Sequence, residues 1–237
     1  MTEPMAEAKR PPSAIDQAFL TDDPDVGIIL LVRHGQQQWP DPETSTTGDW
    51  IDPPLSDLGR QQADAVGKYL ADEPVSTVYS SHLLRANHTG EAVASHHELD
   101  VNVVEDLEEF RMFGHLPPDQ RAADTISEQA LEGIRGRFVQ SLSWDAYPHS
   151  EPSLDFRRRI GYSMEGIMAH HPGETVVVAC HGGVINVVMA QILGLDIDFM
   201  FRPAHASVHR VRFGNGRRVI ESLNEHQFLR LAGLLTY

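Results

Sequence analysis

The sequence has little cysteine and no long hydrophobic run. Cys180 is the only cysteine among 237 residues, which excludes an intramolecular disulfide framework and fits a reducing cytosol. No apolar run approaches the roughly 18 residues of a membrane-spanning helix. Lys9-Arg10 has no apolar stretch behind it, so no signal peptide is expected. We therefore expect a cytoplasmic protein without a membrane partner.

Basic residues are also scarce: 19 lysines and arginines stand against 34 aspartates and glutamates, for a net charge of −15. This balance argues against nucleic acid as a partner, because its binding rewards a basic surface. An anionic substrate would need a locally positive pocket. The length suffices to bury a full core.

An apolar run, residues 28–32, ends abruptly in Arg33-His34-Gly35. The run is typical of a strand buried on both faces, as in a parallel sheet. Unpaired buried charge is costly, so packing gives no reason for such an ending. Ligands of open α/β sheets bind beyond the carboxyl ends of the strands. Arg33 and His34 are therefore candidate functional residues.

Strands and helices alternate along much of the remaining chain, which indicates βαβ units. Strands are expected at 75–80, 101–104 and 175–180, and helices at about 56–71, 82–95, 153–170 and 184–193. A late hairpin is expected around Gly214-Asn215-Gly216. These patterns predict an α/β fold, a three-layer α/β/α sandwich with a mostly parallel sheet.

The domain organisation is expected to be simple. Residues 1–25 lack an apolar period and are predicted to be a flexible N-terminal arm, whereas 26–237 would form a single domain. Residues 36–55 predict a long loop over the first strand end. Residues 107–152 break the alternation and predict a helical cap insertion, where substrate selection would occur. Ser153 is a candidate N-cap for the helix that follows.

Further polar residues follow the other buried strands. The strand at 175–180 ends in His181-Gly182, where a helix begins, and Arg85 comes shortly after the strand at 75–80. Two arginines, a histidine and a helix N-terminus at Gly182 would together cradle a dianionic phosphoryl group.

The sequence resembles the histidine phosphatase superfamily, also called phosphoglycerate mutase-like. The resemblance spans residues 28–224 and rests on four blocks in order. They are Arg33-His34-Gly35, then Leu55-Ser56-x-x-Gly59 with Gln62, then Ser81-x-Leu83-x-Arg85-Ala86-x-x-Thr89, and last His181-Gly182-Gly183.

By this resemblance His34 would be the nucleophile that takes the phosphoryl group as a phosphohistidine. Arg33, Arg85 and His181 would bind the phosphoryl oxygens. A histidine nucleophile needs a free lone pair, which flanking arginines favour by lowering its pKa, and its other nitrogen would donate to a backbone carbonyl.

A carboxyl group would protonate the leaving oxygen and then deprotonate the attacking water. Leu107-Glu108-Glu109 is where the resemblance places it. Glu109 fits the expected spacing better than Glu108, and both remain candidates.

The chain departs from many relatives just after the nucleophile, where Gln37 and Pro40 replace a hydroxyl residue and an asparagine. Gln37 could still donate to phosphate, whereas Pro40 cannot replace an amide. The dense basic pattern of cofactor-dependent phosphoglycerate mutases is not found after Glu109. The lack of this basic pattern favours hydrolysis over mutase chemistry.

Other residues are interpreted as structural. His96-His97 and His170-His171 have no carboxylate or cysteine partners nearby for a metal, so no metal or cofactor is expected. Cys180 is interpreted as a buried thiol, and Arg157-Arg158-Arg159 as a solvated helix face.

Several residues near the expected site have open roles. Trp39 and Trp50 would either wall the pocket or pack the loop. His205 and Ser207 precede a late strand, and either could touch phosphate. The remaining group, Phe110, Met112 and Phe113, suggests an apolar lid.

The leading hypothesis is a metal-independent phosphomonoesterase acting on a small phosphorylated substrate or a phosphoprotein. A phosphoglycerate mutase-type phosphoryl transfer is the alternative among enzymes. A regulatory module that binds a phospho-ligand without turnover is the alternative from another class, and Gln37 and Pro40 keep it open. The oligomeric state is open, a homodimer included.

Overall fold

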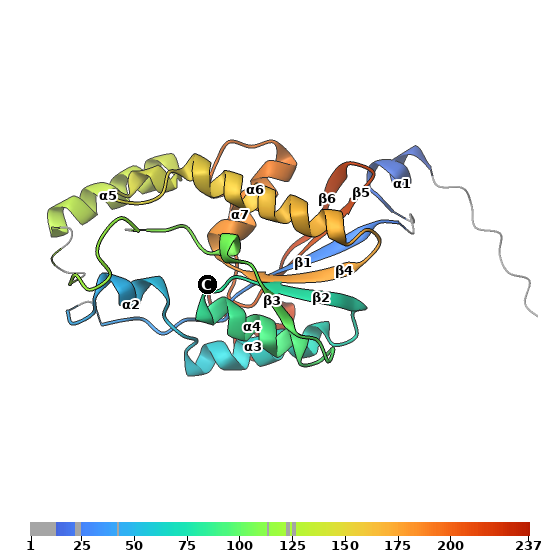
Figure 1. Cartoon of the computed structure of the whole chain (residues 1–237), viewed down its shortest axis with the longest axis horizontal. Helices are drawn as coiled ribbons and strands as arrows, with labels where there is room; N and C mark the ends of the chain where they lie inside the picture. The colour runs from blue at the N-terminus through green and yellow to red at the C-terminus, as the bar shows by residue number, and fades with distance from the viewer. Residues whose placement is uncertain (1–12, 22–24, 42, 113, 122–123, 125–126) are drawn as a thin grey trace, which may run out of the picture.

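A computed structural model describes residues 13–21, 25–41, 43–112, 114–121, 124 and 127–237 (Figure 1). Its centre is a six-stranded sheet in the order β3-β2-β4-β1-β5-β6. The strands are β1 (Gly27–Arg33), β2 (Val75–Ser80), β3 (Val101–Val103), β4 (Thr175–Cys180), β5 (Val208–Gly214) and β6 (Arg217–Glu225). β1 to β4 run parallel, and β5 and β6 add an antiparallel hairpin at one side.

Helices cover both faces of the sheet, so the expected three-layer α/β/α fold is confirmed (Figure 1). One face carries α6 (Ser153–His170) and α7 (Gly182–Leu193), and the other carries α3 (Asp57–Leu70), α4 (Leu84–Ala94) and α8 (Gln227–Leu231). Among the helices of the described ranges, none is both long and apolar enough to cross a bilayer.

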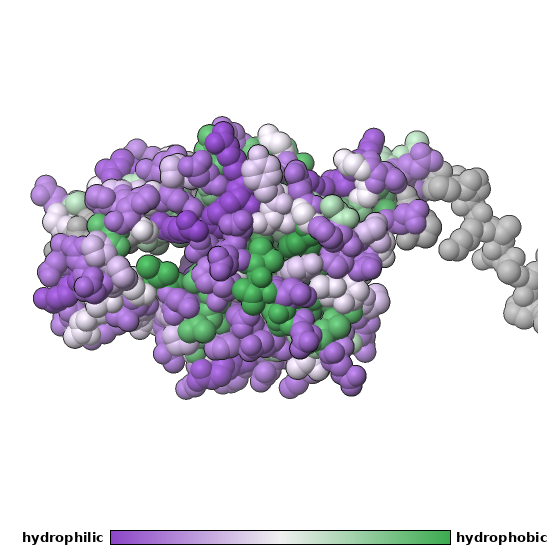
Figure 2. Space-filling model, in the orientation of Figure 1, coloured by the Kyte–Doolittle hydropathy of each residue, from purple (hydrophilic) through white to green (hydrophobic). Residues whose placement is uncertain are grey.

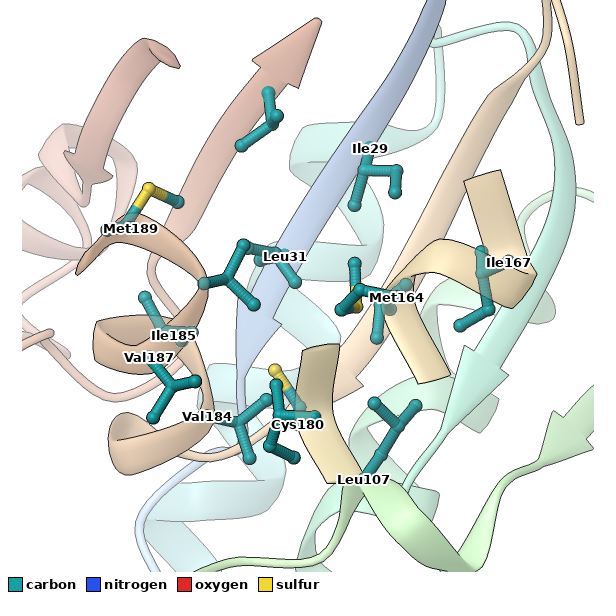
Figure 3. Close-up of a cluster of buried hydrophobic side chains, with 14 of the residues drawn as sticks. Ile29, Leu31, Leu107, Met164, Ile167, Cys180, Val184, Ile185, Val187 and Met189 are labelled. Carbon is teal, nitrogen blue, oxygen red and sulfur yellow. The ribbon is translucent and has the colours of Figure 1, made fainter. Parts of the chain in front are cut away.

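Alternate side chains of β1 supply the two cores. Ile29 and Leu31 point to the face of α6 and α7, where Met164 and Ile185 meet them (Figure 3). Leu30 faces the layer of α3 and α4 instead. All are almost fully buried, which explains why this strand reads as a continuous apolar run.

The N-terminal residues depart from the expectation of a flexible arm within their described part. α1 (Ala14–Ala18) begins with a capping box between Ser13 and Asp16. Leu20 is only 2% exposed, and its carbonyl accepts from Arg212 of β5. This segment lies at the edge of the sheet away from the strand ends that carry His34 and His181 (Figure 1). Residues 1–12 lie outside the described part.

The predicted cap contains α5 (Glu128–Ser141) and the short η3 (Trp144–Ala146) and extends beyond the strand ends (Figure 1). The prediction that Ser153 caps α6 is wrong, because Pro152 is the N-cap. The Ser153 hydroxyl instead donates to the buried carboxylate of Asp198, which also accepts from Ser143. Asp198 thereby ties the cap to the loop after α7.

The face of the molecule in Figure 2 is mostly hydrophilic, in keeping with the excess of acidic residues. Apolar residues gather near β3, where Val103 is 53% exposed. Apolar atoms make up a large part of any folded protein's surface, so this exposure alone indicates no function.

Candidate active site

Two neighbouring parallel strands deliver the two histidines to one edge of the sheet. Arg33 at the end of β1 pairs with Cys180 at the end of β4, and the His34 N–H donates to the Cys180 carbonyl at 2.9 Å. The ring centroids of His34 and His181 are consequently 5.1 Å apart. The sequence prediction that these strand ends converge is confirmed.

Close backbone packing fixes the turn after His34. A Cβ atom on Gly35 would lie 2.3 Å from the Gly59 carbonyl oxygen, and one on Gly59 would lie 1.9 Å from the Gln36 oxygen. The Thr89 hydroxyl accepts from the Gly35 N–H and donates to the Arg85 carbonyl. These contacts explain the glycine at positions 35 and 59, where no side chain fits, and the threonine at position 89, whose hydroxyl bonds the turn.

The orientation of His34 suits a nucleophile. Its Nδ1 lies 2.7 Å from the Gly35 carbonyl oxygen, which can only accept, so Nδ1 carries the proton and Nε2 keeps its lone pair. Burial, followed by the positive charge of Arg85, holds the pKa of His34 well below its usual value. The expected hydrogen bond to a backbone carbonyl is present. Burial is the largest single cause of the lowered pKa of His34, ahead of any one flanking charge.

Buried polar atoms without a protein partner surround this position. Among the described residues, the unpaired atoms include Nε of Arg33, Nε of Arg85 and both ring nitrogens of His181. Burial and the charges of Arg85 and Arg33 hold the pKa of His181 well below its usual value. Burial lowers the pKa of Arg33 to about 10, so it stays charged at neutral pH. Such atoms are costly in a protein interior unless a ligand satisfies them.

Arg85 reaches the site from the first turn of α4. Its guanidinium donates to the Ile51 carbonyl at 3.0 Å and lies 3.9 Å from the Asp52 carboxylate. Asp52 also accepts from the Leu84 N–H at 2.7 Å, so it ties the loop 36–55 to the start of α4. The side chain of Arg85 is only 6% exposed, so Arg85 is not a solvated helix arginine.

The two candidate carboxyl groups point to different surroundings. Glu109 accepts from the Gly183 N–H at 3.1 Å, at the start of α7 beside His181. Its charge acts on both Arg33 and Arg85. Glu108 instead pairs with Arg111, and its other oxygen lies 3.9 Å from His82. The geometry brings Glu109, and not Glu108, to the two histidines.

Arg159 is a contributor that the sequence interpretation missed. It was expected on a solvated helix face, but it donates to the backbone carbonyls of Asp106, Glu108 and Glu109 and pairs with Glu151. The solvated position predicted for Arg157 is also wrong, because Arg157 binds Asp198. Only Arg158 has the expected exposed position, with 61% of its side chain accessible. An arginine in the middle of a helix gives no sequence sign of which distant carbonyls it will meet.

The loop after the nucleophile forms an open pocket. Residues Gln38, Trp39, Pro40, Asp41, Thr44, Ser45, Gly48, Asp49, Asp52, Pro53 and Pro54 line a volume of about 410 Å³. The backbone of Gln37 pairs with Leu55. Trp39 is 68% exposed in this pocket, whereas Trp50 donates to Ser45 within the loop. Trp50 thus packs the loop, whereas Trp39 lines a pocket whose lining includes none of His34, Arg85 and His181, so the prediction that it walls the active site stays a prediction.

Two further sequence interpretations change. Phe110 is 5% exposed and stacks on Trp144 with ring centroids 4.6 Å apart, so it belongs to the core and not to a lid. Phe113 of the same group lies outside the described residues. The Ser207 hydroxyl donates to the Ala204 carbonyl, so it is not free for phosphate. His205 lies near the site, with its ring 5.9 Å from that of His34.

The described residues contain no group of three or more histidine, cysteine or carboxylate side chains suited to a metal ion. His171 instead bridges Tyr79 and Glu174. Burial raises the pKa of the Cys180 thiol, which suits the inert core residue that the sequence predicted. The donor set at the site, histidine and arginine, fits an oxyanion.

The fold and the site together define an α/β protein with two histidines and two arginines gathered where the parallel strands of its sheet end. Residues 29–226 match the histidine phosphatase superfamily (branch 1), and the chain belongs to that family. Its members include phosphatases and phosphoryl-transferring mutases, and a phosphohistidine mechanism is general to them.

Known relatives carry names from both groups. The chain is 33% identical over 174 residues to phosphoglycerate mutase-like protein 4 of Arabidopsis thaliana, covering 72% of this chain and 73% of the relative. It is 28% identical over 187 residues to a probable phosphoglycerate mutase of Salmonella arizonae, covering 78% and 84%. The solved structure of YhfR from Bacillus stearothermophilus is 25% identical, with a TM-score of 0.71 and coverage of 84% and 97%. A mycobacterial glucosyl-3-phosphoglycerate phosphatase has the same fold, with 24% identity, a TM-score of 0.68 and coverage of 84% and 99%.

Proposed function

We propose that this protein is a metal-independent phosphomonoesterase that works through a phosphohistidine on His34. The observation that carries the proposal is the state of His34 among its neighbours. Its Nδ1 proton is committed to Gly35, and Nε2 keeps a lone pair. The unpaired buried donors of Arg33, Arg85 and His181 surround it. A neutral nucleophile inside a positive cradle is what attack on a phosphate dianion requires.

The first step forms a bond between His34 Nε2 and phosphorus while the bond from phosphorus to the leaving oxygen breaks. Glu109 gives its proton to that oxygen. Arg33, Arg85, His181 and the start of α7 at Gly182 meet the charge on the three other oxygens. Gln37 is a further candidate donor. In the second step water attacks phosphorus, Glu109 takes its proton, and the phosphorus–nitrogen bond breaks to release phosphate.

Hydrolysis is favoured over mutase chemistry by the charges next to Glu109. Arg111, the first cation after it, is paired with Glu108. Arg111 is therefore not available to bind the carboxylate or second phosphate of a phosphoglycerate. The names of the sequence relatives favour a mutase as the second candidate. The expected substrate is a small phosphorylated molecule.

The test compares the unaltered chain with His34→Ala on an aryl phosphate without added metal. Turnover by the former and none by the latter is the expected result. Quenching in alkali, which preserves a phosphorus–nitrogen bond, should trap label on the protein only when His34 is present. Most of the activity remaining in His34→Ala would exclude the mechanism. Exchange between 2- and 3-phosphoglycerate faster than hydrolysis would favour the mutase, and tight phosphate binding without turnover would favour the regulatory module.

A further inference from the structure

One edge of the Arg33 guanidinium is held by the segment before β5. One terminal nitrogen donates to the Pro203 carbonyl, and the other lies 3.1 Å from Nε2 of His205. The remaining donor, Nε, is buried without a protein partner on the side of Gly182, where an added Cβ would lie 3.6 Å away. The 203–205 segment therefore sets where Arg33 can present its free donor.

The protonation state of His205 follows from this contact. A guanidinium can only donate, so His205 Nε2 must accept and its proton must lie on Nδ1. Nδ1 lies 2.9 Å from the hydroxyl oxygen of Thr236, to which it donates. The His205 backbone N–H also donates to the Thr236 carbonyl at 3.0 Å. His205 is 3% exposed, so Thr236 fixes both its tautomer and its place.

The same hydroxyl is joined to the other side of the nucleophile. Thr236 Oγ1 accepts from the side-chain amide of Gln62 at 2.8 Å. The amide oxygen of Gln62, a fully buried residue, accepts from the Gln36 N–H at 2.7 Å. Thr236 thus connects the two sides of His34. On one side it reaches Arg33 through His205, and on the other it reaches Gln36 through Gln62. The end of the chain lies at this edge of the sheet (Figure 1).

We propose that His205 and Thr236 are positioning residues that aim the Arg33 guanidinium at the phosphoryl group, so the segment after α8 completes the active site. The inference deepens the proposed function and rests on it for the identity of the bound group. Neither residue touches the substrate. Both act through Arg33.

The test measures binding of inorganic phosphate by calorimetry and the kinetics of an aryl phosphate. Thr236→Val removes the acceptor and should weaken phosphate binding about fivefold, the effect of one hydrogen bond. Thr236→Ser keeps the hydroxyl and should bind within about twofold of the unaltered chain. His205→Leu should weaken binding about tenfold or more, whereas His205→Gln, which places an oxygen near Nε2, should recover part of it.

A double-mutant cycle separates positioning from folding. In an Arg33→Ala background, Thr236→Val should have a much smaller effect on phosphate binding, because only the contact with Gln62 is then lost. An equal loss in both backgrounds would overturn the inference, as would unchanged binding in Thr236→Val and His205→Leu or no phosphate binding by the unaltered chain. If phosphate binds with this pattern but the ester is not turned over, the inference stands and the proposed phosphatase function fails.

Discussion

The Glu109 carboxylate accepts a hydrogen bond from the backbone N–H of Gly183, with 3.1 Å between the two atoms. The start of α7 therefore anchors the proposed acid and base in the same turn that carries His181. The proton donor and the phosphoryl site are thereby kept in fixed relation.

Glu109→Gln should lower kcat for an alkyl phosphate by roughly 10²- to 10⁴-fold, because the leaving oxygen loses its proton donor. Glu108→Gln is the matched control and should lower kcat less than about tenfold, since Glu108 pairs with Arg111 and not with His34 or His181. Steady-state kinetics of both variants provide the measurement. A larger loss in Glu108→Gln would reassign the acid.

Arg159→Leu should lower kcat while leaving the affinity for inorganic phosphate within about twofold, because it releases the backbone that carries Glu109 and not the phosphoryl cradle. Arg158→Leu is the control on the same helix, at an exposed position. Kinetics and phosphate calorimetry on both variants separate the two effects. Equal behaviour of the two variants would show that the contacts of Arg159 do not matter.

The sequence predicted the parts of the site that lie at strand ends. His34 and His181 stand out because a buried apolar strand does not need a histidine at its end for packing. Parallel strands also bring their carboxyl ends to the same edge of the sheet. Arg159 and Thr236 could not be predicted, because their contacts join segments far apart in the chain and depend on side-chain direction. Phe110 was assigned to a lid because apolar character alone does not say which way a loop residue turns.

The Gly35–Gly59 contact should tolerate no side chain. Gly35→Ala would bring its Cβ to 2.3 Å from a backbone oxygen, so the backbone must move and both stability and activity should fall. Gly166→Ala, at an exposed helix position with nothing within 4 Å, should instead stabilise the protein by about 0.5–1 kcal/mol. Thermal unfolding and aryl phosphate turnover of both variants test this. A stable, active Gly35→Ala would mean that the turn can shift freely.

Stability should fall as the pH drops below 6.5. Burial, with the charge of Arg33, lowers the pKa values of His205 and His209 from 6.5 to about 3. Between these values the unfolded chain binds protons that the folded chain does not, so each histidine adds a slope of up to about 1.4 kcal/mol per pH unit. Above pH 6.5 both states are neutral, and these residues contribute no pH dependence.

Chemical unfolding between pH 7.5 and 4.5 measures this slope. His209→Gln should reduce the slope by up to the contribution of one histidine, although the variant is expected to be less stable at every pH. His88→Gln, at an exposed position on α4, is the control for replacing a histidine by glutamine. An identical slope in His209→Gln would show that His209 accepts a proton in the folded state, which its burial between Ser207 and Asn224 opposes.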